Sequence, residues 1–297
     1  MSENPLHASF YADRAVQCTA AIVENVRLAR DTYRVRVECP EIAQQITPGK
    51  FVMLRVAGMN DPLIGRPLAL YDVAASSPGG PYDLLDVVYL VKGKFSSRLA
   101  QLDRHDRLDV WGPLGNGFMP QPTDHLIMVA GGIGQTPFLA LAKEYLGQKQ
   151  YGNPPRTVPR AERVTFCYGA RSADYFAGLS DFEALGLELH LSTDDGSRGH
   201  AGLVTDLLKQ VLDQPATETS AAGRRIVCCG PERMMQSVAH IAADAGVPCE
   251  VSLETPMACG VGICFTCVAM IRDDQGNSDY QRTCVEGPVF DAQRVVW

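Results

Sequence analysis

Three cysteines stand within nine residues near the C-terminal end of the chain, and they restrict its fold more than any other feature of the sequence. They are Cys259, Cys264 and Cys267 in the stretch ACGVGICFTC, and sixteen residues separate the third from Cys284. The two glycines between the first two cysteines tolerate backbone angles that a side chain would block. The stretch is therefore predicted to be a tight loop that wraps around a metal centre.

The order C-x4-C-x2-C…C is the spacing of plant-type [2Fe–2S] sites, in which thiolates hold the irons. Structural zinc is the alternative, but zinc sites usually take two separated pairs of close ligands, whereas three of these cysteines stand together. We therefore predict that Cys259, Cys264, Cys267 and Cys284 bind a [2Fe–2S] cluster. Because such a cluster passes single electrons, electron donors and acceptors are expected nearby.

Composition narrows the class of protein. The chain has 297 residues, which exceeds the size at which one core keeps growing, so two or three domains are expected. A net charge of −7 without a basic stripe makes nucleic acid an unexpected partner. The N-terminal residues lack the pattern of a signal peptide, and no 18-residue uncharged apolar stretch follows. We expect a cytoplasmic protein without membrane contact, in which thiols stay reduced and scattered cysteines such as Cys18 and Cys39 are small core residues.

Hydrophobic patterning divides the chain into three regions after an N-terminal tail at 1–14. Residues 15–121 hold short runs that alternate apolar and polar, such as YRVRVEC and KFVMLRV, which is typical of an antiparallel barrel or sandwich. Residues 122–246 repeat an apolar run, a turn and a helical pattern, which indicates a parallel sheet with crossover helices. Residues 247–297 hold the cysteine loop and a short β-like tail. The Pro-rich insert 147–162 is expected to be a surface loop.

Two stretches of the first region suit a flavin. GRPLALYD places Arg66 at the end of a probable strand, where it can pair with a pyrophosphate. The turn at 93–97 in VKGKFSSRL offers N–H groups to the same phosphates. Alone, neither stretch is specific, because the first also suits an ordinary strand end and the second a surface helix capped by Ser96.

Two strand-turn-helix stretches suit a nucleotide. In LIMVAGGIGQTP the bare turn at Gly131, Gly132 and Gly134 lets a phosphate or a nicotinamide ring approach the backbone. The stretch IVCCGPERMM places Gly230 at the carboxyl edge of the same sheet. Close strand-to-helix packing is the other reason for glycine at such positions. Two glycine turns at the carboxyl edge of one sheet nevertheless favour a ligand crevice.

The order of the motifs R-P-x-x, G-P-x-G-N-G-F, V-A-G-G-I-G-x-T-P and C-C-G-P-x-x-M resembles the ferredoxin–NADP reductase superfamily. With ACGVGICFTCVAM and RTCVEGPVF following, the whole chain is similar to the electron-transfer subunits of NAD-dependent dihydroorotate dehydrogenases. The resemblance implies a multidomain fold, with an antiparallel β-barrel FAD domain, an α/β parallel-sheet NAD domain and a small C-terminal [2Fe–2S] domain. It also implies a partner, the catalytic FMN-containing dihydroorotate dehydrogenase subunit, in a heterotetramer. Electrons then pass from that FMN through the cluster and FAD to NAD+ in pyrimidine (UMP) biosynthesis.

The resemblance also assigns residues to the cofactors. Flavin contacts are expected at Arg66, Pro67, Leu68, Ala69, Val88, Tyr89, Leu90, Phe95 and Ser96. Nucleotide contacts are expected at Gly131, Gly132, Gly134, Thr136, Pro137 and Gly230. Two positions depart from the family pattern. The family usually has Ser or Thr, whose hydroxyl can bond the flavin N5, in place of Ala69, and Gly in place of Phe95, which leaves less room beside the pyrophosphate.

The choice of nicotinamide follows from charge. In LSTDDGSRGHAG, Asp194 and Asp195 follow a probable strand, where carboxylates bond the free ribose hydroxyls and repel a 2′-phosphate. We therefore expect NAD rather than NADP, although Arg198 is able to pair with such a phosphate. Two other classes of function stay open. One is a reductase subunit of another complex, of the hydrogenase gamma or NADH-dependent ferredoxin:NADP oxidoreductase kind, and the other is a zinc-binding interaction module.

Overall fold

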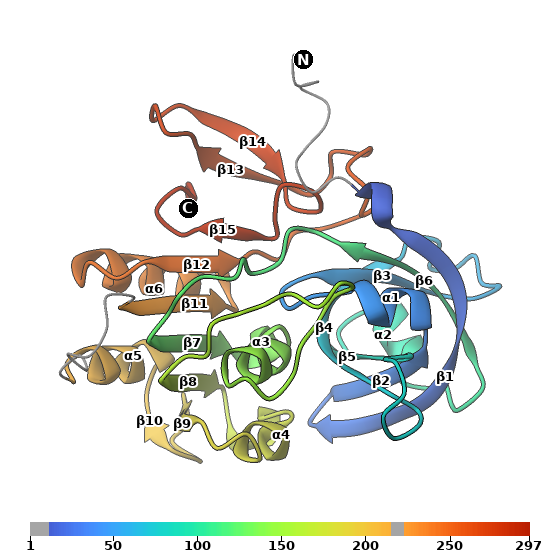
Figure 1. Cartoon of the computed structure of the whole chain (residues 1–297), viewed down its shortest axis with the longest axis horizontal. Helices are drawn as coiled ribbons and strands as arrows, with labels where there is room; N and C mark the ends of the chain where they lie inside the picture. Colours follow the sequence, from blue (N-terminus) through green and yellow to red (C-terminus); the bar gives the residue numbers. More distant parts are fainter. Residues whose placement is uncertain (1–11, 215–222) are drawn as a thin grey trace.

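The computed structural model describes residues 12–214 and 223–297 of the chain. Within them, the N-terminal region forms a closed antiparallel barrel with the strand order β1-β2-β5-β4-β3-β6, which confirms the barrel (Figure 1). The strands are β1 (Val16–Ala29), β2 (Thr32–Glu38), β3 (Phe51–Val56), β4 (Arg66–Ala74), β5 (Leu84–Leu90) and β6 (Arg107–Leu114). The short elements η1 (Ala12–Arg14), α1 (Pro40–Gln45) and α2 (Lys94–Leu99) accompany them.

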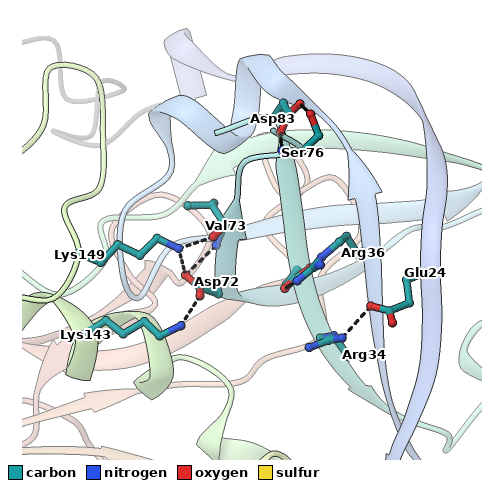
Figure 2. A network of polar contacts seen from close by, with 10 residues as sticks. Glu24, Arg34, Arg36, Asp72, Val73, Ser76, Asp83, Lys143 and Lys149 are labelled. Carbon is teal, nitrogen blue, oxygen red and sulfur yellow. Dashed lines mark hydrogen bonds and ion pairs between the residues drawn. The ribbon is translucent and has the colours of Figure 1, made fainter. Parts of the chain in front are cut away.

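Alternation along each strand produces the barrel wall. On β2 the side chains of Val35 and Val37 are fully buried inside the barrel, because every second residue of a strand faces the same side. The intervening Arg34 and Arg36 form ion pairs outside that core, and Arg36 bonds Asp86 of β5 through both its Nε and its Nη2, at 2.6 and 2.7 Å (Figure 2). The period-2 pattern therefore fixes which face of each strand fills the barrel.

The next region forms a sheet, which in the described part of the chain has the order β10-β9-β8-β7-β11-β12-β15. All neighbours are parallel except β12 and β15, and the central strand β7 is an apolar run buried on both faces. The strands are β7 (His125–Gly131), β8 (Arg163–Ala170), β9 (Glu188–Thr193), β10 (His200–Ala201), β11 (Arg224–Cys229), β12 (Cys249–Ser252) and β15 (Val289–Asp291). The helices are η2 (Gly132–Gln135), α3 (Phe138–Tyr145), η3 (Ala173–Tyr175), α4 (Leu179–Glu183), α5 (Val204–Leu212) and α6 (Glu232–Asp244).

The cysteine loop lies between this sheet and a hairpin of β13 (Val268–Arg272) and β14 (Ser278–Arg282), which stands apart from the barrel at the top of Figure 1. Two strands of the expected cluster domain at 247–297, β12 and β15, pair within the parallel sheet. The domain boundaries therefore stay a proposal. Most of the tail expected at 1–14 lies outside the described residues, and its last residues form η1. Across 12–214 and 223–297, no helix has the length and apolar character needed to span a bilayer.

The insert 147–162 has no helix or strand, as expected, but Tyr151 within it is buried. Tyr151 is 1% exposed, and its hydroxyl donates to Asp72 of β4 at 2.8 Å. Lys143 of α3 and Lys149 bond the same carboxylate at 2.6 and 2.7 Å (Figure 2). We call Asp72, Lys143, Lys149 and Tyr151 the interdomain junction. It joins the barrel to the parallel sheet, so the prediction of a plain surface loop was wrong for this part of the insert.

Candidate functional site

The four predicted cluster ligands come together as two pairs. The thiol of Cys264 is hydrogen-bonded with Cys259, and that of Cys267 with Cys284. Plant-type [2Fe–2S] clusters take four cysteine thiolates over two irons, and two pairs of thiols fit that requirement. Cys264 is exposed, whereas Cys267 and Cys284 are buried. In the described parts of the chain, no group of three or more His, Cys, Asp or Glu side chains is placed to hold a single metal ion.

Two of these thiols have lowered pKa values. Burial acts to raise the pKa of Cys264, but hydrogen bonds with Thr266 and Cys259 outweigh burial and lower it to about 6. The hydrogen bond with Cys284 lowers the pKa of Cys267 to about 6 and raises that of Cys284. Because the thiolate is the form that ligates metals, the surroundings of Cys264 and Cys267 favour the ionised state that iron requires.

The cysteine loop is shaped by its glycines and packed on the barrel. Gly260 and Gly262 have φ of +75° and +82°, which confirms that the loop uses backbone angles open to glycine. A Cβ on Gly260 would lie 2.6 Å from Cγ of Met53 on β3, so the backbone must approach closely there. On β6 the indole of Trp111 donates to the carbonyl of Cys259 at 2.9 Å. The loop is therefore fixed against β3 and β6.

Sequence reasoning missed Trp111 and two other anchors of this loop. Asn116 bonds the backbone of Val289 in both directions, at 2.8 and 3.1 Å, and so ties the C-terminal tail to the barrel. The Arg282 guanidinium donates to the carbonyl of Gly262 at 3.0 Å and lies 5.0 Å from the centre of the Phe265 ring. The only signal for Asn116 was its place in the turn WGPLGNGF, which also suits a simple barrel-closing loop.

The residues expected to hold the flavin divide between two faces of the barrel. Tyr71 and Val88 pack in the apolar cluster of the parallel sheet, and the Tyr71 hydroxyl donates to Asp181 at 2.7 Å. Ala69 is two residues from Tyr71 on β4 and shares its outward face. By the same alternation Pro67 and Leu90 also face outward. The turn η2 lies against β5.

The other flavin candidates point into the barrel. Leu68 packs against the barrel core, and Tyr89 is 2% exposed, with its hydroxyl donating to Asn25 at 3.0 Å. Phe95 is 3% exposed in the same core. Its ring therefore fills the barrel rather than the space beside a pyrophosphate, which corrects the expectation of reduced room. The side chains of Tyr89 and Phe95 are therefore occupied in the barrel core.

The residues expected to contact the flavin pyrophosphate, in the turn before α2 and at Arg66, differ in detail from expectation. Gly93, not Ser96, is the N-cap of α2, and the Ser96 hydroxyl accepts from the N–H groups of Lys92 and Gly93 at 2.9 and 3.0 Å. Those two N–H groups are thus already engaged. At the start of β4 the exposed Arg66 guanidinium donates only to the carbonyls of Ile64 and Gly65, and no described carboxylate pairs with it. Arg66 is therefore a cation that is available at this end of the barrel.

Glycine is needed for different reasons at the different positions of the nucleotide turn. A Cβ on Gly134 would lie 2.2 Å from the carbonyl oxygen of Cys229, and one on Gly131 would lie 2.6 Å from Sδ of Met234. A Cβ on Gly230 would also meet Met234, so close packing explains all three. Gly132 differs, with φ of +56° and no atom within 4 Å of the point that a Cβ would occupy. It is the glycine that leaves open space for a ligand.

Three further nucleotide candidates lie near this edge of the sheet. Thr136 and Pro137 lead into α3 and are buried. Asp194 follows β9 and is exposed, and no described cation pairs with its carboxylate. The neighbouring Asp195 is engaged by Ser197, which donates to it through its N–H at 3.0 Å and its hydroxyl at 2.6 Å. Asp194 is therefore the carboxylate free to bond a ribose.

Comparison with known proteins identifies each region. Residues 19–118 match the oxidoreductase FAD-binding domain family, and residues 128–240 match the oxidoreductase NAD-binding domain family. Residues 254–296 match the iron-sulfur cluster binding domain of dihydroorotate dehydrogenase B. These matches confirm the three predicted cofactors, FAD, NAD and an iron–sulfur cluster.

Relatives along the whole chain have the same organisation. The chain is 35% identical over 279 residues to the dihydroorotate dehydrogenase B (NAD(+)) electron transfer subunit of Desulforamulus reducens, covering 94% of this chain and 97% of that protein. It is 34% identical to the protein of the same name from Geobacillus kaustophilus, covering 91% and 94%. A solved structure of NADH-dependent reduced ferredoxin-NADP oxidoreductase has a TM-score of 0.74 at 27% identity, covering 94% and 90%. By identity over nearly its full length, the chain belongs to the family of dihydroorotate dehydrogenase B (NAD(+)) electron transfer subunits.

Proposed function

We propose that the chain carries electrons from the FMN of a catalytic dihydroorotate dehydrogenase subunit to NAD+, in pyrimidine biosynthesis. When bound, the cluster exchanges single electrons and FAD exchanges a hydride with the nicotinamide. The observation that carries the proposal is the bond from Trp111 to Cys259, because it fixes the cluster loop to the same barrel that holds the flavin residues. One folded unit then presents both redox sites.

The nucleotide edge supports NAD. The free carboxylate of Asp194 suits ribose hydroxyls and opposes a 2′-phosphate. The Arg198 guanidinium lies 3.6 Å from Glu183 and is thereby drawn to a carboxylate of α4. Arg198 is thus less available to neutralise a phosphate on the ribose, which favours NAD over NADP.

The surface around the exposed ligand Cys264 suits the catalytic partner. Ile263 and Phe265, which flank it, are 70% and 60% exposed. Phe265 also has φ of +54°, a conformation that bulky residues rarely adopt. Large exposed apolar side chains mark docking sites, and a partner that donates electrons must come close to the cluster. We therefore propose that the catalytic subunit docks on this surface with a complementary apolar patch.

A second pair of exposed apolar residues extends this surface. Leu63 and Ile64, in the loop before β4, are 62% and 47% exposed. A Cβ on the next residue, Gly65, would lie 2.4 Å from the Trp111 ring, and Trp111 bonds Cys259. The loop before β4 therefore lies beside the cluster loop.

We propose that two copies of this chain and two catalytic subunits assemble into a heterotetramer. Light scattering of the co-expressed complex measures its mass and tests this proposal.

The experiment uses the purified chain with and without its catalytic subunit. Alone, it should reduce dyes with NADH but oxidise no dihydroorotate. In the complex, Cys264→Ser should abolish dihydroorotate-dependent NAD+ reduction and spare NADH-to-dye activity. Gly132→Trp fills the open space of the nucleotide turn and should remove both NAD-dependent activities. Cys167→Ala, at a buried thiol of β8 away from the loop, is the matched control and should keep its iron and its activity.

Two outcomes would overturn the proposal. The first is dihydroorotate oxidation by this chain alone, and the second is normal NAD+ reduction by a Cys264→Ser complex that contains no iron. Docking is tested separately by Phe265→Glu, which should weaken subunit association at least about tenfold. Leu203→Glu, at a residue 61% exposed beside the far edge of the sheet, is the control. Equal association of both variants would place the partner elsewhere.

A further inference from the structure

Two cysteines outside the cluster loop lie against each other in the barrel wall. The sulfurs of Cys18 on β1 and Cys39 at the N-cap of α1 are 2.9 Å apart. That distance is below the roughly 3.5–4.0 Å at which non-bonded heavy atoms settle. It exceeds the length of a disulfide bond by only about 1 Å. Cys39 lies in the barrel core and Cys18 packs against it, as expected, but the two cysteines also form a contact pair.

The pair has one thiol that solvent reaches and one that it does not. Cys18 is half-buried, and Cys39 is 1% exposed. The hydrogen bond with Cys39 lowers the pKa of Cys18, against opposing effects of burial and of the Glu41 and Asp109 carboxylates. The same bond and burial raise the pKa of Cys39. Because the thiolate is the nucleophile, Cys18 is the thiol that reacts first with an oxidant in solution.

We propose that Cys18 and Cys39 form a reversible disulfide that locks the start of β1 to the corner between β2 and α1. The oxidant is a low-molecular-weight disulfide. The Cys18 thiolate attacks one of its sulfurs, forming a mixed disulfide and releasing one thiol. Cys39, after losing its proton, then attacks the Cys18 sulfur and releases the second thiol. Two protein thiols are thus oxidised, and one small disulfide is reduced to two small thiols.

The strand pairing shows which connection the disulfide would add to the barrel. The ladder between β1 and β2 ends at Ile22 and Val37, so the segment of β1 before Ile22 is paired to β6 alone. The disulfide joins this segment to the β2 side and closes that end of the barrel. On β6, Trp111, which anchors the cluster loop, lies opposite Gln17, the residue before Cys18. Oxidation therefore stiffens the strand that pairs with β6 behind the cluster site.

The test equilibrates the holoprotein in buffers of reduced and oxidised glutathione, followed by alkylation under denaturing conditions and peptide mapping. Wild type should lose two alkylatable thiols and yield a linked peptide that contains Cys18 and Cys39, and excess reductant should reverse both. Its unfolding temperature should rise by about 5–10 °C on oxidation, as expected for closing a loop of this length in a protein of this size. Cys18→Ser should abolish the rise, and Cys167→Ala should keep it.

Three results would overturn the proposal. The first is that both thiols of the wild type stay alkylatable at every glutathione ratio. The second is glutathione attached at Cys18 without the linked peptide. The third is an equal temperature rise in Cys18→Ser. The alkylation measurement needs no variant, so the proposal stays testable even if Cys18→Ser fails to fold, and iron content measured on the same samples separates the disulfide from damage to the cluster.

Discussion

Replacing Asp72 with asparagine tests how strongly the interdomain junction holds the barrel against the parallel sheet. The carboxylate accepts from Lys143 and Lys149 of the second region and from the N–H of Val73 at 2.8 Å (Figure 2). It also accepts from the hydroxyl of Tyr151, which belongs to the second region too. Asp72→Asn keeps the shape but removes the charge. It leaves two lysines without their counter-charge at a buried site.

The cost follows from burial. Removing one partner of a buried ion pair costs roughly 3–5 kcal/mol, because the other charge stays desolvated. The side chains of Lys143 and Lys149 are 24% and 15% exposed, so solvent relieves part of that penalty. We therefore expect a loss of about 3 kcal/mol in the free energy of unfolding, at the lower end of the range. For a protein of this size the unfolding temperature should fall by roughly 5 °C.

The pKa values of Asp72 and Lys149 are both lowered, which favours the charged form of the carboxyl and disfavours that of the amine. Burial acts to raise the pKa of Asp72, but Lys149 and Lys143 outweigh it and lower that pKa. Burial lowers the pKa of Lys149 more than Asp72 raises it. The Asp72 carboxylate stays ionised because it accepts hydrogen bonds from four donors. Lys149 is the group that bears the cost of desolvation. The folded protein therefore loses most stability when the Asp72 carboxylate that faces this lysine is neutralised.

The lowered pKa of Asp72 determines how its contribution to stability changes with pH. A carboxyl whose pKa is lower in the folded state adds stability above its unfolded pKa and loses it as pH falls through the folded value. The difference between wild type and Asp72→Asn should therefore stay constant from about pH 8 to 5 and shrink only below about pH 4. A difference that already halves between about pH 8 and 6 would assign the effect to another group.

Calorimetry of the FAD-loaded chain makes the measurement. The control is Asp61→Asn, which removes a surface ion pair with Lys94 whose side chains are 71% and 66% exposed. Such pairs contribute about 0–1 kcal/mol, so its unfolding temperature should move by no more than about 2 °C. If Asp72→Asn shifts the temperature no more than this control, the junction does not hold the two parts together.

Three further substitutions test the site. Ala69→Ser should place a hydroxyl on the outward face of β4 and shift the flavin potential by a hydrogen bond worth on the order of 1 kcal/mol, and an unchanged midpoint in spectroelectrochemistry would show that another group serves N5. Trp111→Phe removes the bond to Cys259 and should speed iron loss on dialysis severalfold, with retention at the wild-type rate as the contrary result. Gln135→Met replaces a fully buried carboxamide whose nitrogen and oxygen have no described partner, so stability should rise by about 1 kcal/mol, whereas a fall measured by calorimetry would mean that the amide has a partner when the cofactors are bound.

The features that were predictable from the sequence are those with local causes. The alternation in β2 and the apolar run of β7 each fix the type of strand, because a period of two or an unbroken apolar run is read within a few residues. The loop glycines Gly260 and Gly262 were also predictable, since the chain must turn sharply between close thiols. Such patterns need no knowledge of what lies across the fold.

The features that were missed join segments far apart in the chain. Trp111 and Cys259 are 148 residues apart, and nothing local in either stretch indicates the bond between them. Tyr151 stands in a polar, Pro-rich insert, yet it is buried because Asp72 of the barrel receives its hydroxyl. Cys18 and Cys39 look like isolated small residues until the barrel closes. In each case the partner, not the local pattern, decides the role.

The anchoring of the cluster loop determines which ligand is the cleaner probe of the relay. Trp111 holds the loop to β6, and β15 pairs with β12 of the sheet, so the surrounding fold is fixed by contacts other than iron. Cys264 is exposed and contributes little to packing beyond its thiol, whereas Cys284 is 0% exposed within an apolar cluster. Replacing Cys284 therefore changes the core and the metal site together. Replacing Cys264 changes the metal site alone, so a loss of coupling in that variant reports on electron transfer rather than on folding.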